Sequence, residues 1–167
     1  MNIIRSLRAA AVMLVAALPT HAAAEQRDAP TILDFISLWL QSEYQLGQPA
    51  SLPVIVAMPP AELLTRRYGE GVDTDPAEVV ALYDAEAGSI LVSEAWTGGT
   101  VAEISILVHE MVHHIQQDAG TVFACPAARE RLAYRAQDDW LKLFGQDLQS
   151  AFGIDPALIL VATVCTH

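Results

Sequence analysis

The sequence predicts an α+β protein in which a small sheet packs on helices. Two observations support this fold class. Segments with apolar residues at helical spacing are interspersed with short β-branched runs, and their order is helix, strand, helix, two strands and then helices. The chain has 167 residues, which is enough for one domain with its own core.

The first 24 residues are predicted to be a secretory signal peptide and not part of that domain. Arg5 and Arg8 precede an apolar run at 9–18, and small residues follow at Ala22–Ala24, where we expect cleavage. The alternative is an uncleaved membrane anchor, but such a short run cannot span a bilayer, which needs about 20 apolar residues. We therefore expect a single mature domain at 25–167, secreted or periplasmic and without stable membrane insertion.

Three elements are predicted in the first part of the mature chain. Apolar residues at helical spacing in 31–44 predict a helix with a broad buried face, which Gly47 and Pro49 end. The short β-branched run at 52–58 is bounded by prolines and predicts a buried strand. Residues 60–71 predict a short helix that glycines stop.

Five further elements are predicted in the rest of the chain. Residues 78–84 and 89–94 predict two strands around a turn, and a glycine-rich turn then leads into a helix at about 101–118. Residues 125–145 predict another helix, with proline at its start and glycine at its end. The apolar run at 157–164 is too short to cross a membrane, and we expect it to close the core as a buried helix or strand.

The charge balance argues against a nucleic-acid partner. The chain has 9 Lys and Arg against 20 Asp and Glu, a formal net charge of -11. Proteins that bind nucleic acid need a basic face to neutralise phosphates, which this composition does not favour. The acidity favours solubility and says nothing about the substrate.

The two cysteines, Cys125 and Cys165, are predicted to form a disulfide bond if the chain is exported to an oxidising compartment. The bond would tie the C-terminal segment back to the segment that follows the 101–118 helix. The alternatives are two buried free thiols or soft metal ligands. The C-x-x-C spacing of many metal sites is missing, which disfavours ligands.

The motif that carries chemistry is His109-Glu110-Met111-Val112-His113, a match to H-E-x-x-H. Residues four apart on a helix share a face, so His109 and His113 can bind one ion, and zinc suits imidazole nitrogens. Glu110 can reach a water molecule on the metal without being a ligand. Zinc lowers the pKa of that water to about 7, and the carboxylate can accept its proton.

The alternative is a helix whose histidines bond to backbone groups or carboxylates. Burying His109, Glu110 and His113 without partners in an otherwise apolar helix would be costly, which favours the metal. His114 lies about 100° from His113 around the helix and cannot share its face, so we expect it at the surface or behind the ligands.

A catalytic zinc ion usually has three protein ligands, and we expect Glu130 to be the third. It lies in the first turns of the 125–145 helix, which can place it opposite both histidines. The alternative is a solvated glutamate paired with Arg131 or Arg135. Asp138 and Asp139 are the next candidates for the ligand but lie two turns or more further along.

These stretches resemble the zincin-fold metallopeptidases of the glutamate-ligand type, the gluzincins, and most of all small zincin-like proteins exported by bacteria. The resemblance covers residues 78–145. It implies His109, His113 and Glu130 as zinc ligands and Glu110 as general base. It also implies that residues 89–94 form an antiparallel edge strand beside the substrate cleft. The 16 residues between His113 and Glu130 are at or below the short end for that family.

Zincins often stabilise the oxyanion with a tyrosine or histidine. Tyr134 lies one turn after Glu130, and Tyr83 lies just before the expected edge strand, so either can serve. The alternative for both is ordinary packing with the hydroxyl group at the surface. We therefore expect an exported zinc peptidase that hydrolyses peptides or proteins. The other hypotheses are a non-catalytic zinc- or partner-binding module on the same scaffold and a structural protein without metal.

Overall fold

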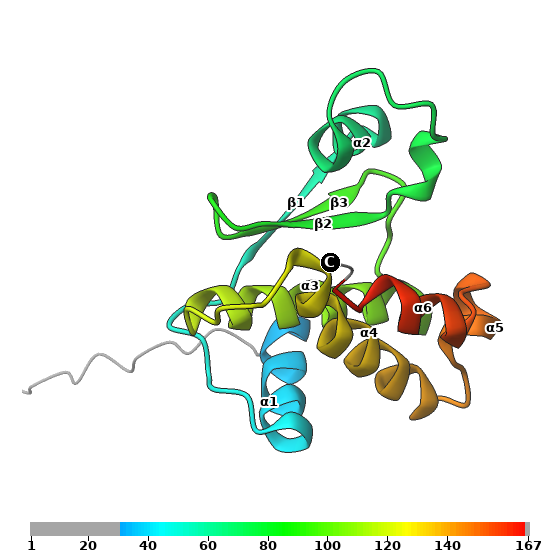
Figure 1. Ribbon diagram of the computed structural model, residues 1–167. Coiled ribbons are helices and arrows are strands. Elements are labelled where there is room, and N and C mark those ends of the chain that lie inside the picture. Colours follow the sequence, from blue (N-terminus) through cyan, green and yellow to red (C-terminus); the bar gives the residue numbers. More distant parts are fainter. Residues whose placement is uncertain (1–30, 166–167) are drawn as a thin grey trace, which may run out of the picture.

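The computed structural model describes residues 31–165 and confirms the α+β class (Figure 1). The predicted signal peptide lies outside the described residues. Among residues 31–165, no helix is both long enough and apolar enough to cross a membrane. In chain order, the elements are α1 (Ile32–Tyr44), β1 (Val54–Met58), α2 (Pro60–Tyr68), a short 3-10 helix η1 (Pro76–Glu78), β2 (Ala81–Asp84), β3 (Ser89–Ser93), α3 (Val101–Asp118), α4 (Pro126–Lys142), α5 (Leu148–Phe152) and α6 (Pro156–Ala162).

Local signals in the sequence account for the ends of the main helices. Thr31 caps α1 and Thr100 caps α3, each in a capping box with the acidic residue three positions later. Pro126 occupies the first turn of α4, where its missing N–H group costs nothing. The structure therefore confirms these predicted helices, whereas the short helix α5 was not predicted.

The sheet has three strands in the order β1-β3-β2. β3 pairs in parallel with β1, with Val54 opposite Ser89, and antiparallel with β2, with Tyr83 opposite Ile90. The prediction that residues 89–94 form an edge strand is wrong, because β1 occupies the other side of β3. The antiparallel edge strand is β2.

The strand β1 is not the buried strand that its β-branched residues suggested. It has one neighbour in the sheet, and Val54 and Val56 are exposed. Both share a face with Met58, because side chains alternate along a strand. Helix α2 covers only the Met58 end of that face, where Met58 packs in one cluster with Leu63 of α2.

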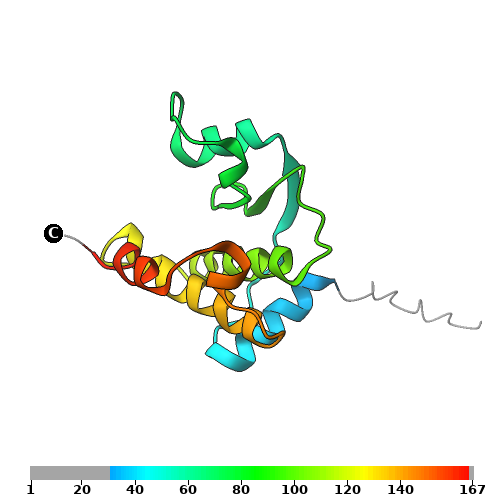
Figure 2. The ribbon, with the colours of Figure 1, turned by 90° about the vertical axis from the view of Figure 1, so that its right-hand side faces the viewer.

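The molecule is layered, with α2 on one face of the sheet and the other helices beyond the opposite face (Figures 1 and 2). Successive side chains of β3 point to opposite faces of the sheet and pack in different clusters. Leu91 packs in the cluster with α2, whereas Ile90 and Val92 pack in the main core with α1, α3 and α4. Helix α3 lies in the middle of this arrangement, in contact with the sheet, α1 and α4.

The C-terminal apolar run forms the helix α6 but does not close the core. Leu158, Leu160 and Val161 are all exposed, and only Thr163 just beyond the helix is buried. The helix lies against α4, and the predicted disulfide bond between Cys125 and Cys165 is present. The bond therefore fastens this segment to the start of α4, which holds it in place without burying it.

Candidate metal centre

Helix α3 supplies two of the three side chains that meet at the centre of the molecule. His109 and His113 are one turn apart, and their rings meet edge to face with centroids 4.9 Å apart. The first turn of this helix is fixed by Thr100, whose hydroxyl oxygen accepts a hydrogen bond from the backbone N–H of Glu103. The helix thus begins at a defined residue and places both rings on the face toward α4.

Helix α4 runs antiparallel to α3 and supplies the third side chain. Gln116 bonds to the carbonyl group of Arg129 near one end of the pair, and Ser105 bonds to Gln137 near the other. Glu130 lies between these two contacts, opposite both histidines. The connection between the helices spans residues 119–125 and turns at Gly120, whose φ of 59° is in the left-handed region that favours glycine.

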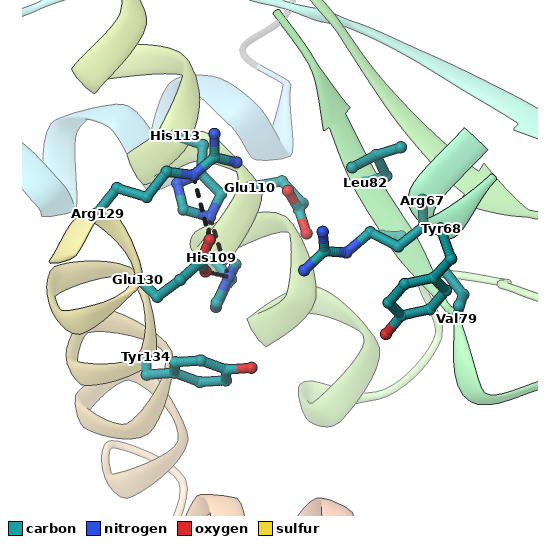
Figure 3. Close-up of a pocket in the computed structure, with 11 residues that line it drawn as sticks. Arg67, Tyr68, Val79, Leu82, His109, Glu110, His113, Arg129, Glu130 and Tyr134 are labelled. Carbon is teal, nitrogen blue, oxygen red and sulfur yellow. Dashed lines mark hydrogen bonds and ion pairs between the residues drawn. The ribbon is translucent and has the colours of Figure 1, made fainter. Parts of the chain in front are cut away.

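The three side chains converge on one point (Figure 3). Oε2 of Glu130 lies 3.1 Å from Nε2 of His109 and 3.1 Å from Nε2 of His113, and the two Nε2 atoms are 3.2 Å apart. These three residues form a group that could hold a metal ion. The structure therefore brings together the residues that the sequence singled out as ligands.

The hydrogen bonds on the far side of each ring fix its tautomer. Gln116 donates from Nε2 to the carbonyl oxygen of Arg129, so its Oε1, which lies 3.1 Å from Nδ1 of His113, is the acceptor there. Nδ1 of His113 therefore carries a proton, and in the neutral ring Nε2 presents a lone pair toward Glu130.

The ring of His109 is fixed in the same way by a longer chain of hydrogen bonds. The Ser105 hydroxyl donates to the carbonyl oxygen of Ala102 and accepts from Nε2 of Gln137. Oε1 of Gln137 then accepts from Nδ1 of His109 at 3.1 Å. When both rings are neutral, two lone pairs and a carboxylate oxygen thus face one another, an arrangement that a cation satisfies.

The size of this triangle fits zinc. Ligand atoms bonded at about 2.05 Å to one tetrahedral zinc ion lie about 3.3 Å apart. The observed separations of 3.1, 3.1 and 3.2 Å are close to that value. Two imidazole nitrogens and one carboxylate oxygen are also a donor set found in catalytic zinc sites. The residues present therefore fit the ion.

The carboxylate of Glu130 is held at both of its oxygens. Oε1 accepts a hydrogen bond from Nε of Arg129 at 3.1 Å, while Oε2 faces the histidines. Burial alone would raise the pKa of Glu130, but the hydrogen bonds and charges that His109 and His113 offer when their rings are protonated outweigh it and keep the pKa well below its usual range. Glu130 is therefore an anion at neutral pH.

Glu110 lies beside the three ligand side chains and opens into the same cavity. This space of about 190 Å³, called here the metal cavity, is also lined by His109, His113 and Glu130. Glu110 itself is buried, yet within residues 31–165 the structure records no hydrogen bond or ion pair to its carboxylate. Its oxygens are therefore left for a molecule inside the cavity.

The metal cavity has two walls that belong to different layers of the fold (Figure 3). The helices α3 and α4 form one wall, to which Tyr134 contributes, with its ring 4.7 Å from that of His109. Arg67 and Tyr68 of α2, with Leu82 of β2, form the opposite wall. Burial and then the charge of Glu130 raise the pKa of Tyr134, so its hydroxyl group keeps its proton and can donate a hydrogen bond.

The structure does not bring Tyr83, the second candidate for the oxyanion, to the metal cavity. Its ring is buried in the main core, and its hydroxyl group lies 3.0 Å from Nδ1 of His114. His114 is buried too, and its Nε2 donates to the carbonyl oxygen of Ser51 at 2.7 Å. His114 therefore ties α3 to β2 and to the segment before β1, and does not face the metal ligands.

The lesser candidates also lie elsewhere. Asp138 accepts a hydrogen bond from the backbone of Leu148, and Asp139 accepts one from the hydroxyl group of Tyr44. Both aspartates also pair with Lys142.

The sequence did not point to four residues that shape the site. Gln116 and Gln137 orient the two rings, Arg129 holds the ligand carboxylate, and Arg67 lines the opposite wall. Gln116 was detectable in principle, because it lies three residues after His113 on the same helix and can therefore reach its ring. Arg67 carried no such signal, because it approaches the cavity from a different layer.

The comparisons with known proteins place the chain in a family without assigning a function. Residues 24–167 match a family described as a domain of unknown function, DUF6647, and the chain belongs to that family. Neither the curated proteins nor the solved structures contain a match. Any functional assignment therefore depends on the chemistry of the candidate metal centre.

Proposed function

We propose that the protein is a zinc-dependent metallopeptidase that hydrolyses peptide bonds. One observation carries the proposal. A buried carboxylate, that of Glu110, opens into the cavity beside three converging ligand atoms and is engaged by no described residue. A protein that only stores or senses zinc needs the ligands but has no use for this carboxylate.

The roles of the side chains follow from their positions. Zinc held by His109, His113 and Glu130 would supply Lewis acidity and lower the pKa of a water molecule to about 7. Glu110 accepts a proton as the water oxygen bonds to the peptide carbonyl carbon. It returns a proton to the amine when the C–N bond breaks, so the products are one carboxylic acid and one amine.

Tyr134 is the side chain best placed to stabilise the oxyanion. It lines the metal cavity from the same helix as Glu130, and its hydroxyl group points into the cavity (Figure 3). A donor aimed at the developing charge lowers the barrier without contributing to the resting state. We also propose a secreted or periplasmic location, supported by the disulfide bond, which is typical of oxidising compartments.

The experiment that tests this function measures zinc and hydrolysis on the same preparations. We expect about one zinc ion per chain after dialysis, and none in Glu130→Ala, because a catalytic site needs all three ligands. Glu110→Gln should retain the zinc and lose at least about 100-fold in kcat/KM against a broad peptide library. Glu86→Gln removes an exposed charge in the β2–β3 turn and is the matched control.

The alternative is a non-catalytic zinc- or partner-binding module, and the same measurement separates the two functions. Zinc bound with no cleavage of any peptide would favour that module. Cleavage that survives Glu110→Gln would contradict the mechanism. A folded protein that binds no zinc, even after zinc is added, would contradict both the peptidase and the zinc-binding module.

A further inference from the structure

Most positive charges among the described residues of this acidic protein gather around the metal cavity. The chain has a formal net charge of -11, and the described residues carry only six Lys and Arg side chains. Two of them line the metal cavity itself, and three more line the two cavities that adjoin it. In the same order, these residues are Arg67 and Arg129, then Arg66, Arg131 and Arg135. Five of the six described cations therefore lie at or next to one cavity and are not spread over the surface.

Three of these five cations, Arg66, Arg129 and Arg135, have an acidic partner. Arg66 pairs with Glu62 and Asp84 of its own layer, and Arg129 pairs with the ligand Glu130. Arg67 differs from both. No carboxylate among the side chains that the structure describes lies within ion-pair distance of its guanidinium group.

The orientation of Arg67 directs its charge into the metal cavity. Its side chain extends from α2 toward the wall that carries Glu110 and the metal ligands (Figure 3). The guanidinium carbon lies 5.2 Å from the centre of the Tyr68 ring, a cation–π contact that limits where the group can point. A planar guanidinium group held in this way is suited to bind a carboxylate through two parallel hydrogen bonds.

The charge inside the metal cavity supports an anionic ligand. Arg67 and Arg129 balance Glu110 and Glu130, and the two histidines add no charge when they bind a cation through Nε2 and keep the proton on Nδ1. A divalent cation at the three ligands therefore makes the cavity positive by two charges, inside a protein that is otherwise acidic. An anion enters this cavity more readily than it approaches the rest of the surface.

We infer that Arg67 binds a carboxylate of the substrate, so that the enzyme acts on peptides with a negative charge close to the bond that is cleaved. This inference rests on the proposed peptidase function. The carboxylate has two sources, the free C-terminus of the peptide and the side chain of an aspartate or glutamate. Arg67 approaches from the wall opposite the metal ligands, so it binds a group next to the reacting carbonyl and not the carbonyl itself.

The test compares kcat/KM for matched peptides with the zinc-loaded protein. One pair differs only in a C-terminal acid or amide, and another pair differs only in glutamate or glutamine beside the cleaved bond. We expect one of the two pairs to show a preference for the charged peptide of about 10- to 100-fold, the usual strength of hydrogen bonds to a charged group. The pair that shows it identifies the source of the carboxylate.

Variants assign that preference to one residue. In Arg67→Gln the ratio of charged to neutral peptide should fall toward one, and Arg67→Lys should restore part of it. Arg66→Gln is the matched control, because Arg66 neighbours Arg67 on the same helix but does not line the metal cavity. If Arg67→Gln left this ratio unchanged, the inference would be overturned. An equal loss of kcat/KM on charged and neutral peptides would also overturn it, because Arg67 would then act on the chemical step and not on the charge of the substrate.

A binding measurement separates this inference from the proposed function. Zinc-loaded Glu110→Gln is titrated with the same fluorescent peptide acid and peptide amide, with and without Arg67→Gln. Tighter binding of the acid that disappears in Arg67→Gln supports the inference, even where no peptide is cleaved and the peptidase function fails. Cleavage of all peptides without a charge preference would support the peptidase and overturn the role of Arg67. Acid binding that depends on zinc but not on Arg67 would also overturn it.

Discussion

The side-chain oxygen of Gln137 lies 3.1 Å from Nδ1 of His109, on the edge of the ring that faces away from Glu130. Gln137 lies on α4 and is itself held by a hydrogen bond to Ser105 of α3. It therefore orients the His109 ring while being fixed by the same helix that carries His109. The Gln116–His113 contact has the same chemistry. Both rings are therefore set in orientation and tautomer by protein groups alone.

We predict that replacing Gln137 with methionine weakens zinc binding by about 10- to 100-fold, the usual cost of losing a partner behind a ligand. Methionine has a similar length, so the core around position 137 stays filled. Competition with a chromophoric chelator measures the dissociation constant. Gln117→Met, at an exposed position on α3, is the control and should bind zinc like the wild type. Equal affinities for all three proteins would show that the glutamine does not matter.

A second prediction distinguishes the two tyrosines that the sequence offered for the oxyanion. Tyr134→Phe should lower kcat by about 100- to 1,000-fold, because it removes a donor to the charge that develops during reaction. KM and zinc content should change little, since the hydroxyl group acts after binding. Steady-state kinetics with a saturating peptide gives the result.

Tyr83→Phe provides the contrast. Its hydroxyl group donates to the buried Nδ1 of His114, so the variant leaves that acceptor without a partner. We expect a loss of about 1–3 kcal/mol in the free energy of unfolding, with kcat retained. If Tyr83→Phe lowered kcat and Tyr134→Phe did not, the two roles would have to be exchanged.

A third prediction concerns the disulfide bond. Cys125 and Cys165 are 40 residues apart in sequence, and closing a loop of this length stabilises the folded state by about 4 kcal/mol. The double variant Cys125→Ser with Cys165→Ser should unfold at a correspondingly lower urea concentration. Adding a reducing agent should shift the wild type toward the variant and leave the variant unchanged. Coincident unfolding curves for the oxidised wild type and the variant would refute this.

A fourth prediction concerns acid stability and Glu103. Hydrogen bonds from the backbone of Thr97, from the Thr97 side chain and from Thr100 outweigh partial burial and lower the pKa of Glu103 below its ordinary value of 4.5. A lowered pKa in the folded state means that the stabilisation is complete above that ordinary value. It is lost as the pH falls through the lower, folded value.

The Glu103→Gln variant should therefore be less stable than the wild type at about pH 7, and the difference should shrink at about pH 3. Urea unfolding at both values measures it, with Glu86→Gln as the control for loss of an exposed charge. A difference that stayed constant, or grew in acid, would show that the carboxylate of Glu103 does not supply the effect.

The helices and the grouping of His109, His113 and Glu130 were predictable because their signals are local. His109 and His113 are one turn apart in an apolar helix, and Glu130 follows at the start of the next helix, after a single turn. Helical spacing therefore fixes that the two histidines can meet, and the short connection brings Glu130 within reach of them. The cysteine pair was predictable for a related reason, since only two cysteines are present and one bond is possible.

The features that were not predictable depend on contacts between distant segments. The β-branched residues of β1 do not reveal that it pairs with β3 and leaves β2 at the edge. Nor does the apolar run of α6 reveal that its side chains stay exposed, because a disulfide bond and α4 hold it in place. Arg67 enters the metal cavity only because α2 packs on the sheet, a relationship without periodicity in the sequence.

The contacts of α3 with the two connections between layers have a further consequence. The chain passes between the helical side and the sheet side at 45–53 and at 94–100. Asp118 and His114 hold the first passage through Ala50 and Ser51, and Glu103 holds the second. Helix α3 thus holds both connections and sets the distance between the two walls of the metal cavity. A molecule that enters meets walls already in position, so little of its binding free energy is lost to rearranging the backbone.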